Sequence, residues 1–362
     1  MFCCEKCFKD KLIKNTIKEI GLVGNCDFCA STDVKVIDSM YHSPVSEKIL
    51  DLVESYEVSD NENAKPLREA LVKDWDIFNV DADVVQGLVE TLCHNLVEKD
   101  SPLFKERVII PELYDRDYLN EYCIVKDKTW SYFSEHIKHY NRFHNDCFNS
   151  DAFASMISAM DRGYKAGSVF YRARFSSDSK GLTSDEMFGP PKGQRAAGRV
   201  NPEEIPVLYL SSDPKTVLYE IRSHVYDYVT IGTFELKRDI SLVDLSSMDS
   251  MSPFQFEGGI ERFAINRKAI QEIANEIAKP LRRSDSTLEY LPTQFIVEYI
   301  KSQKYDGVEY SSTIKTNGKN IALFDESLVE CVSVQTVEVT DIEYSTDKEM
   351  IAASAEAPMS SC

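Results

Sequence analysis

Residues 169–174 read Val-Phe-Tyr-Arg-Ala-Arg, an alternation of side chains that predicts a β-strand. A loop rich in glycine and proline follows at 176–206, and then a short apolar strand at 207–210. Asp213 and Pro214 open a helix, because aspartate is a favoured N-cap and proline fits the first helical turn. The stretch therefore begins a domain in which strands and helices are mixed.

Downstream of this stretch the same mixture continues. Further strands are predicted at 228–236, 241–245, 307–310, 320–324 and 332–339. Further helices are predicted at 259–278 and 292–303. This order predicts an α+β domain at 166–340 with a mixed, largely antiparallel sheet, because a regular β-α-β alternation is missing. The small, acidic and polar residues of 341–362 predict a disordered tail.

Upstream, the pattern is helical. One apolar stripe repeats every four residues, at Val84, Leu88, Leu92 and Leu96. Other helices are predicted at 46–56, 128–147 and 153–160. We therefore predict an all-helical domain at 39–165.

Two Cys-x2-Cys pairs stand near the start of the chain: Cys4 with Cys7, and Cys26 with Cys29. Each pair can grip one metal ion from a tight turn, and two pairs supply the four soft ligands of a closed structural zinc site. The pattern predicts a zinc-binding module at 1–38. Buried free thiols are the alternative, and Cys3 could shift the ligand register by one.

The chain carries 41 Lys+Arg against 60 Asp+Glu, a net charge of −19, which disfavours a broad nucleic-acid surface. No apolar run reaches the roughly 18 residues of a membrane span, and the first residues do not resemble a signal peptide. We expect a cytoplasmic protein whose ten cysteines do not form a disulfide framework. The oligomeric state is left open.

The segment 168–199 is basic within this acidic chain, with six basic and three acidic residues. Its basic residues are Arg172, Arg174, Lys180, Lys192, Arg195 and Arg199. Arginines on a strand and a glycine-rich loop suit bidentate phosphate contacts, although a flexible connection would also explain the loop.

Glu220 is the second candidate. An apolar stripe of Val217, Leu218, Ile221 and Val225 is expected to be buried, and Glu220 lies beside it. The carboxylate could face a cleft or solvent, and periodicity does not choose between them.

An ordered series of motifs between residues 169 and 326 resembles the RES domain family, named for an Arg, a Glu and a Ser. The motifs are Tyr171-Arg-Ala-Arg174, Gly198-Arg-Val-Asn-Pro202, Pro206-Val-Leu-Tyr-Leu-Ser211, Val217-Leu-Tyr-Glu220, Tyr305-Asp-Gly-Val-Glu-Tyr-Ser-Ser312 and Asn320-Ile-Ala-Leu-Phe324. The residues before them resemble the zinc-bearing extension and the helical HEPN/RES N-terminal domain of longer members.

The resemblance implies a fold related to ADP-ribosyltransferases and NAD as the molecule attacked. Several members resemble bacterial toxins that hydrolyse or phosphorolyse NAD or transfer its ADP-ribose, and an antitoxin or other inhibitory protein is an implied partner. It assigns the catalytic Arg, Glu and Ser to Arg172, Glu220 and Ser311, with Ser312 as the alternative. The implied pocket residues are Arg172, Arg199, Asn201 and Tyr209; Val200 stands where many members have an aromatic residue.

These roles agree with the chemistry. Cleavage of the nicotinamide–ribose bond builds positive charge on the ribose, which a nearby carboxylate such as Glu220 stabilises. Arg172 and Arg199 would clamp the pyrophosphate, Tyr209 would offer a ring face to nicotinamide, and Ser311 would position ribose or amide.

Two rival functions are weighed: ADP-ribosyl transfer to a macromolecule, and a non-enzymatic nucleotide-binding interaction protein. A HEPN ribonuclease is disfavoured because the helices lack its Arg-x4–6-His pair: Arg142 and His144 are too close together.

Overall fold

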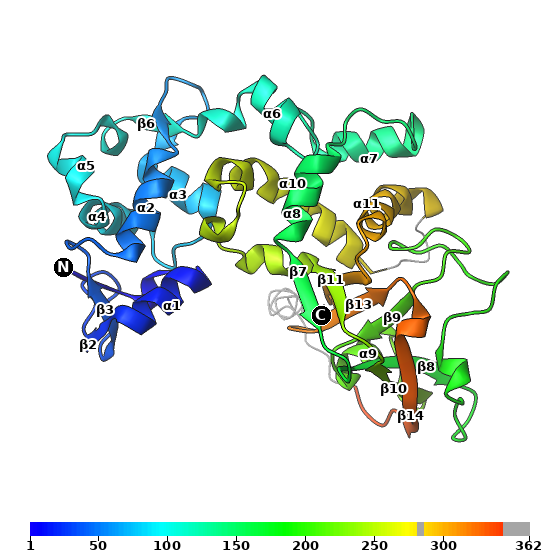
Figure 1. Ribbon diagram of the computed structural model, residues 1–362. Helices are drawn as coiled ribbons and strands as arrows, with labels where there is room; N and C mark the ends of the chain where they lie inside the picture. Colours follow the sequence, from blue (N-terminus) through cyan, green and yellow to red (C-terminus); the bar gives the residue numbers. More distant parts are fainter. Residues whose placement is uncertain (281–285, 343–362) are drawn as a thin grey trace, which may run out of the picture.

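The structure is a computed structural model that describes residues 1–280 and 286–342. The chain forms an arch in Figure 1, with the N-terminal module at the lower left, helices across the top and a large sheet at the lower right. None of the helices in the described ranges is long and apolar enough to cross a membrane.

The N-terminal module is a three-stranded antiparallel sheet in the order β1-β3-β2, covered by one helix. The strands are β1 (Phe2–Cys4), β2 (Leu22–Gly24) and β3 (Val34–Asp38). Helix α1 (Lys11–Ile20) buries Ile13 and Ile17, and the Asp10 side chain caps it by accepting a hydrogen bond from the Ile13 amide at 2.8 Å. Helix α1 thus lies between the two cysteine pairs in the chain.

The next segment is mostly helical. Its helices are α2 (Pro44–Glu54), α3 (Leu67–Trp75), α4 (Ala82–Leu92), α5 (His94–Glu98), α6 (Arg116–Tyr122), α7 (Trp130–His139) and α8 (Ser150–Ser158). It also contains a small antiparallel sheet of β4 (Glu57–Val58), β5 (Lys65–Pro66) and β6 (Arg107–Ile109). The prediction of an all-helical segment was therefore wrong, because the segment also contains these three strands.

The predicted helix over 128–147 was wrong in its second half, because α7 ends at His139. The Asn141 side chain accepts hydrogen bonds from the amides of Phe143 and His144 at 3.3 and 3.0 Å, and donates to the His144 carbonyl at 2.6 Å. Such local bonds offer the backbone an alternative to the helix. The prediction failed because the apolar periodicity of the sequence continues beyond Asn141, although Asn141 closes a turn there.

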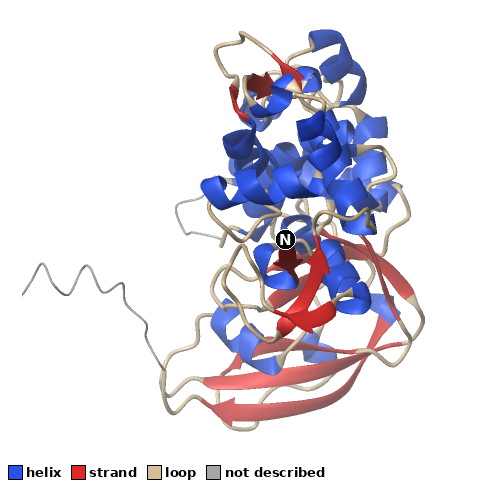
Figure 2. Ribbon diagram, turned by 90° about the vertical axis from the view of Figure 1, so that its left-hand side faces the viewer, coloured by secondary structure: helices blue, strands red, loops and turns tan. Residues whose placement is uncertain are grey.

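The large sheet has eight strands in the order β14-β10-β8-β9-β13-β12-β11-β7. They are β7 (Asp161–Tyr164), β8 (Val169–Ser176), β9 (Leu208–Ser211), β10 (Tyr228–Leu236), β11 (Ile240–Asp244), β12 (Gly307–Ser311), β13 (Lys319–Leu323) and β14 (Val329–Glu338). Among the described strands β11 and β12 are the one parallel pair, so the prediction of a mixed, largely antiparallel sheet is confirmed. Figure 2 shows the sheet at the bottom of the molecule, below the helices.

Three helices accompany the sheet: α9 (Pro214–Glu220), α10 (Ile260–Ala278) and α11 (Leu291–Ser302). Helices α10 and α11 pack against the upstream helices, and one buried apolar cluster runs from Cys3 to Phe324. The domain limits 1–38, 39–165 and 166–340 stay a prediction. Of the predicted tail at 341–362, residues 343–362 lie outside the described residues.

Candidate active site

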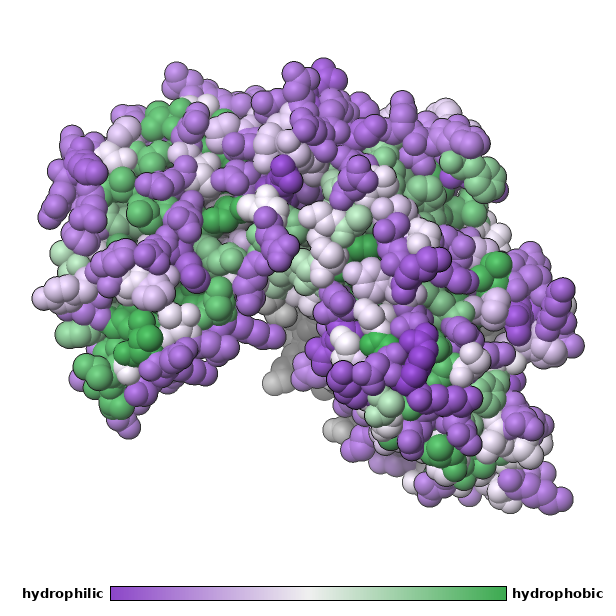
Figure 3. Space-filling view, viewed as in Figure 1, coloured by the Kyte–Doolittle hydropathy of each residue, from purple (hydrophilic) through white to green (hydrophobic). Residues whose placement is uncertain are grey.

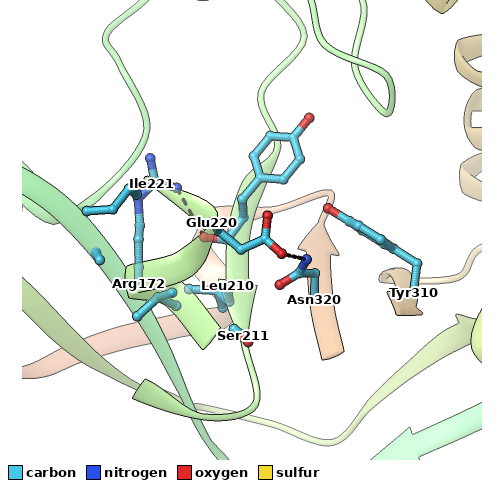
Figure 4. Close-up of a pocket in the computed structure, with 10 residues that line it drawn as sticks. Arg172, Leu210, Ser211, Glu220, Ile221, Tyr310 and Asn320 are labelled. Atoms are coloured by element: carbon cyan, nitrogen blue, oxygen red, sulfur yellow. Dashed lines mark hydrogen bonds between the residues drawn. The ribbon is translucent and has the colours of Figure 1, made fainter. Parts of the chain in front are cut away.

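Five side chains, four from strands of the large sheet and one from helix α9, meet at one cleft (Figure 4). They are Arg172 on β8, Tyr209 on β9, Glu220 at the end of α9, Tyr310 on β12 and Asn320 on β13. Three of the residues predicted from sequence, Arg172, Tyr209 and Glu220, are thus brought together.

Helix α9 places Glu220 over the sheet. The Asp213 carboxylate caps the helix by accepting hydrogen bonds from the amides of Lys215 and Thr216 at 2.9 and 3.0 Å, as its N-cap position predicts. The helix stops after two turns because Arg222 has a left-handed φ of 53°. The predicted burial of Val225 was wrong for the same reason, since it lies beyond the helix and is exposed.

One oxygen of the Glu220 carboxylate is held by two donors. Oε1 accepts from the Ser312 hydroxyl at 2.6 Å and from the Asn320 side-chain amide at 2.7 Å. Both hydrogen bonds are short, and each runs from a neutral donor to a charged carboxylate. They are therefore stronger than hydrogen bonds between two neutral groups. Among the described residues no donor reaches Oε2, so this oxygen faces the cleft with its lone pairs available.

The hydroxyl at Glu220 belongs to Ser312, whereas Ser311 is exposed at the end of β12. Alternate residues of an extended chain point to the same side. Tyr310 lines the cleft, and Ser312, two positions on, lies on the same side and reaches the Glu220 carboxylate, whereas Ser311 points away and is exposed. Alternation from Tyr310 is the signal that could have separated the two serines in the sequence.

The cleft consists of two adjoining cavities of about 200 Å³ each. Tyr209, Glu220, Tyr310 and Asn320 line both, so Glu220 stands at the junction. The first cavity also contains Arg172; the second has cationic and aliphatic walls from Arg199, Val200, Arg222, Ile277, Lys279 and Ile314. This shape suits an extended ligand with two lobes and an anionic centre.

Arg172 is a cation that lines the first cavity. Its Nη1 donates to the Tyr209 carbonyl at 3.3 Å, while its buried Nε has no hydrogen-bond partner. Burial and then the neighbouring Arg174 lower the pKa of Arg172 to about 10, which leaves it charged at neutral pH. A charged group with an unused buried donor is favourably placed to bind an anion.

The side chain of Asn201 makes its hydrogen bonds within the protein. Its Oδ1 accepts from the Tyr209 hydroxyl at 2.7 Å, and its Nδ2 donates to the carbonyls of Ala196 and Pro202 at 3.0 and 3.1 Å. Burial raises the pKa of Tyr209, so the phenol stays a neutral donor to Asn201. Asn201 therefore fixes the Tyr209 ring, and the predicted direct contact with a ligand has less support than this orienting role.

The other arginines of the basic segment hold the loop together. Arg174 Nη1 donates to the carbonyls of Glu186 and Phe188, and Arg195 Nε donates to the Pro190 carbonyl at 2.8 Å. Lys180 and Lys192 are exposed. The sequence did not assign roles to Tyr310 and Asn320, although both stand in the quoted motifs.

The four predicted metal ligands also converge. The Sγ atoms of Cys4, Cys7, Cys26 and Cys29 lie within 4.8 Å of one another, with Cys4–Cys29 and Cys7–Cys26 both at 3.4 Å and Cys4–Cys7 at 4.0 Å. Zn–S bonds of 2.3 Å in a tetrahedron place sulfurs about 3.8 Å apart, so the donor set fits zinc. Cys3 stands outside this group.

Burial raises the pKa of Cys4 to about 12. Thiolates in this place therefore need a cation beside them, which a bound zinc ion would supply.

The stretch of chain that forms the cleft is similar to a known domain family. The model of the RES domain family matches residues 169–347, just under half of the chain, and all residues of the cleft named above fall within this stretch. No curated protein matches the chain. Among solved structures, the M. tuberculosis MbcT–MbcA toxin–antitoxin complex matches at 14% identity and a TM-score of 0.30, covering 53% of this chain and 94% of the other.

Proposed function

We propose that this chain, whose residues 169–347 match the RES domain, consumes NAD by cleaving the nicotinamide–ribose bond. The observation that carries the proposal is Glu220, which stands at the junction of two cavities with one oxygen fixed and the other directed into the cleft. NAD is an extended dinucleotide, and in this proposal C1′ of its nicotinamide ribose lies beside Glu220.

In the proposed reaction the C1′–N bond breaks and its electron pair leaves with nicotinamide. Positive charge then develops on the ribose ring, and Glu220 stabilises it only as it forms, which accelerates the step. Ser312 and Asn320 keep the carboxylate in place, so little reorganisation is needed. Water or phosphate then attacks C1′ and gives up a proton to solvent.

The cations of the cleft are assigned to the pyrophosphate. Arg172 lines the first cavity and Arg199 lines the second, so their guanidinium groups would reach the ligand from both sides of Glu220. Tyr209 and Tyr310 supply ring faces for the nicotinamide.

The test is incubation of the purified chain with NAD, with and without phosphate, followed by mass spectrometry. Hydrolysis would yield nicotinamide and ADP-ribose; phosphorolysis would yield nicotinamide and a phosphorylated ADP-ribose; transfer would label a macromolecule added as acceptor. Absence of nicotinamide in every sample would overturn the proposal.

The remaining expectations stand beside this one as proposals. A zinc ion on the four cysteines would make residues 1–38 a structural module. Because NAD loss would injure a host cell, the activity would need restraint, either by the helical segment covering the cleft or by a separate inhibitory protein of the antitoxin kind. An inhibitor that acts at the cleft should compete with NAD in steady-state kinetics.

A further inference from the structure

The loop 198–201 carries Arg199 and Val200 to the second cavity, and side chains of α11 hold its backbone. Within the loop, Gly198 and Asn201 form a single β-bridge. Gln294 Nε2 donates to the carbonyls of both bridge residues, at 2.8 Å for Gly198 and 3.0 Å for Asn201. The side-chain amide of Gln294 thus binds the backbone at both ends of the loop.

Thr293 holds the middle of the same loop. Its hydroxyl donates to the Arg199 carbonyl at 2.7 Å and shares its hydrogen with the Tyr290 carbonyl at 3.0 Å. The side chain of Arg199 lies over the Tyr290 ring, 5.2 Å from its centroid. The backbone and the guanidinium of Arg199 are therefore both positioned by the start of α11 and the turn before it.

Both polar side chains are almost completely buried, with Thr293 1% and Gln294 7% exposed. Burying polar groups is unfavourable unless their hydrogen bonds are made. Apolar residues of similar size would fill the same space, so the polar groups are explained by the loop carbonyls that they bind.

The opposite side of α11 is anchored to the upstream helices. Phe295 packs edge-on against Phe133 of α7 and against Phe148, with ring centroids 5.5 and 5.1 Å apart. Tyr299 donates through its hydroxyl to the Ser150 carbonyl of α8 at 2.8 Å. Figure 1 shows α11 beside α8 and below α7.

We infer that α11 is a positioning element that ties the substrate loop 198–201 to the helical segment, with Thr293 and Gln294 as its positioning residues. The inference rests on the proposed function, because the loop matters through what Arg199 binds. It gives the helical segment a part in substrate binding: the segment supports the wall of the cleft from behind.

The test compares isosteric variants. Thr293→Val and Gln294→Met remove the donors but keep the volume, while Thr293→Ser keeps the hydroxyl. Loss of one such hydrogen bond corresponds to about a tenfold effect, so Thr293→Val and Gln294→Met should raise KM for NAD about tenfold and change kcat less than about twofold. Thr293→Ser should restore the wild-type KM.

Amide hydrogen exchange at Gly198 and Asn201 gives a second readout that does not depend on catalysis. It should accelerate in both donorless variants and not in Thr91→Val, where the hydroxyl bonds the carbonyl of Leu88 within its own helix. Wild-type exchange in both donorless variants would overturn the inference, as would faster exchange with an unchanged KM. If Thr293→Val fails to fold, Gln294→Met decides on the same readouts. If the wild type does not consume NAD, the proposed function fails, while exchange still reports whether α11 holds the loop.

Discussion

At the scale of single residues, the two serines that follow Tyr310 make the sharpest prediction. Ser312 donates to Glu220 and Ser311 does not, so their alanine variants should differ. A hydrogen bond to a charged group contributes about 1.5–3 kcal/mol, and Ser312→Ala should therefore slow nicotinamide release by at least about tenfold. Ser311→Ala is the matched control and should keep the wild-type rate. Equal rates in the two variants would contradict the assignment.

Arg172 is expected to have opposite effects on stability and on substrate binding. Its lowered pKa means that folding disfavours its charged form, whereas an anionic ligand favours it. Arg172→Met should therefore raise KM for NAD about a hundredfold, as expected for the loss of charge-assisted contacts, without lowering the thermal midpoint. Steady-state kinetics and thermal unfolding of the same preparation test both parts. A lower midpoint with unchanged KM would show a structural role instead.

The sequence predicted much of this site because the ordered motifs identify the strands and the helix that carry Arg172, Tyr209 and Glu220. It did not predict which neighbours hold Glu220. Asn320 is one hundred positions from Glu220 in the chain, and such a contact depends on the pairing of β13 with β9 and β12. Strand alternation at Tyr310 was a usable local signal for Ser312.

At the scale of elements, the cysteine module should depend on its metal. Cys26→Ser removes one of four ligands, and structural zinc sites supply folding free energy directly. The variant should lose bound zinc by elemental analysis, and hydrogen exchange should rise in β1, β2 and β3. Cys3→Ser is the control, because Cys3 lies outside the ligand group. Zinc retained by Cys26→Ser and lost by Cys3→Ser would contradict the ligand set.

Most helices and strands were predictable because their apolar periodicity is regular, as in β10 and α10. Two of the errors fall where one residue ends an element although the apolar periodicity continues. Asn141 closes a turn after α7, and the left-handed conformation of Arg222 stops α9. Both depend on local backbone geometry, which a count of apolar positions does not contain.

At the scale of the whole molecule, the buried cluster from Cys3 to Phe324 predicts coupled unfolding of the two halves. Phe133 is fully buried and touches Phe295 of α11, so Phe133→Ala should cost about 3–5 kcal/mol of unfolding free energy. Both tryptophans, Trp75 and Trp130, lie in the helical segment.

Tryptophan fluorescence and NAD consumption should therefore be lost at the same denaturant concentration, and Phe133→Ala should shift both together. Separate transitions would show that the halves are independent. The sequence placed α10 and α11 with the sheet by chain order. Their packing against the upstream helices was not predictable, because an amphipathic pattern shows which face of a helix is buried but not which element packs against it.

The account as a whole depends on Glu220 as the group that promotes cleavage of NAD. The most direct measurement is the rate of nicotinamide release by the wild type and by Glu220→Gln, prepared and assayed together, with thermal unfolding to show that both are folded. We expect release by the wild type and a loss of at least about a hundredfold in the variant, since the amide carries no charge to stabilise the ribose. Equal rates in two folded proteins would contradict the account.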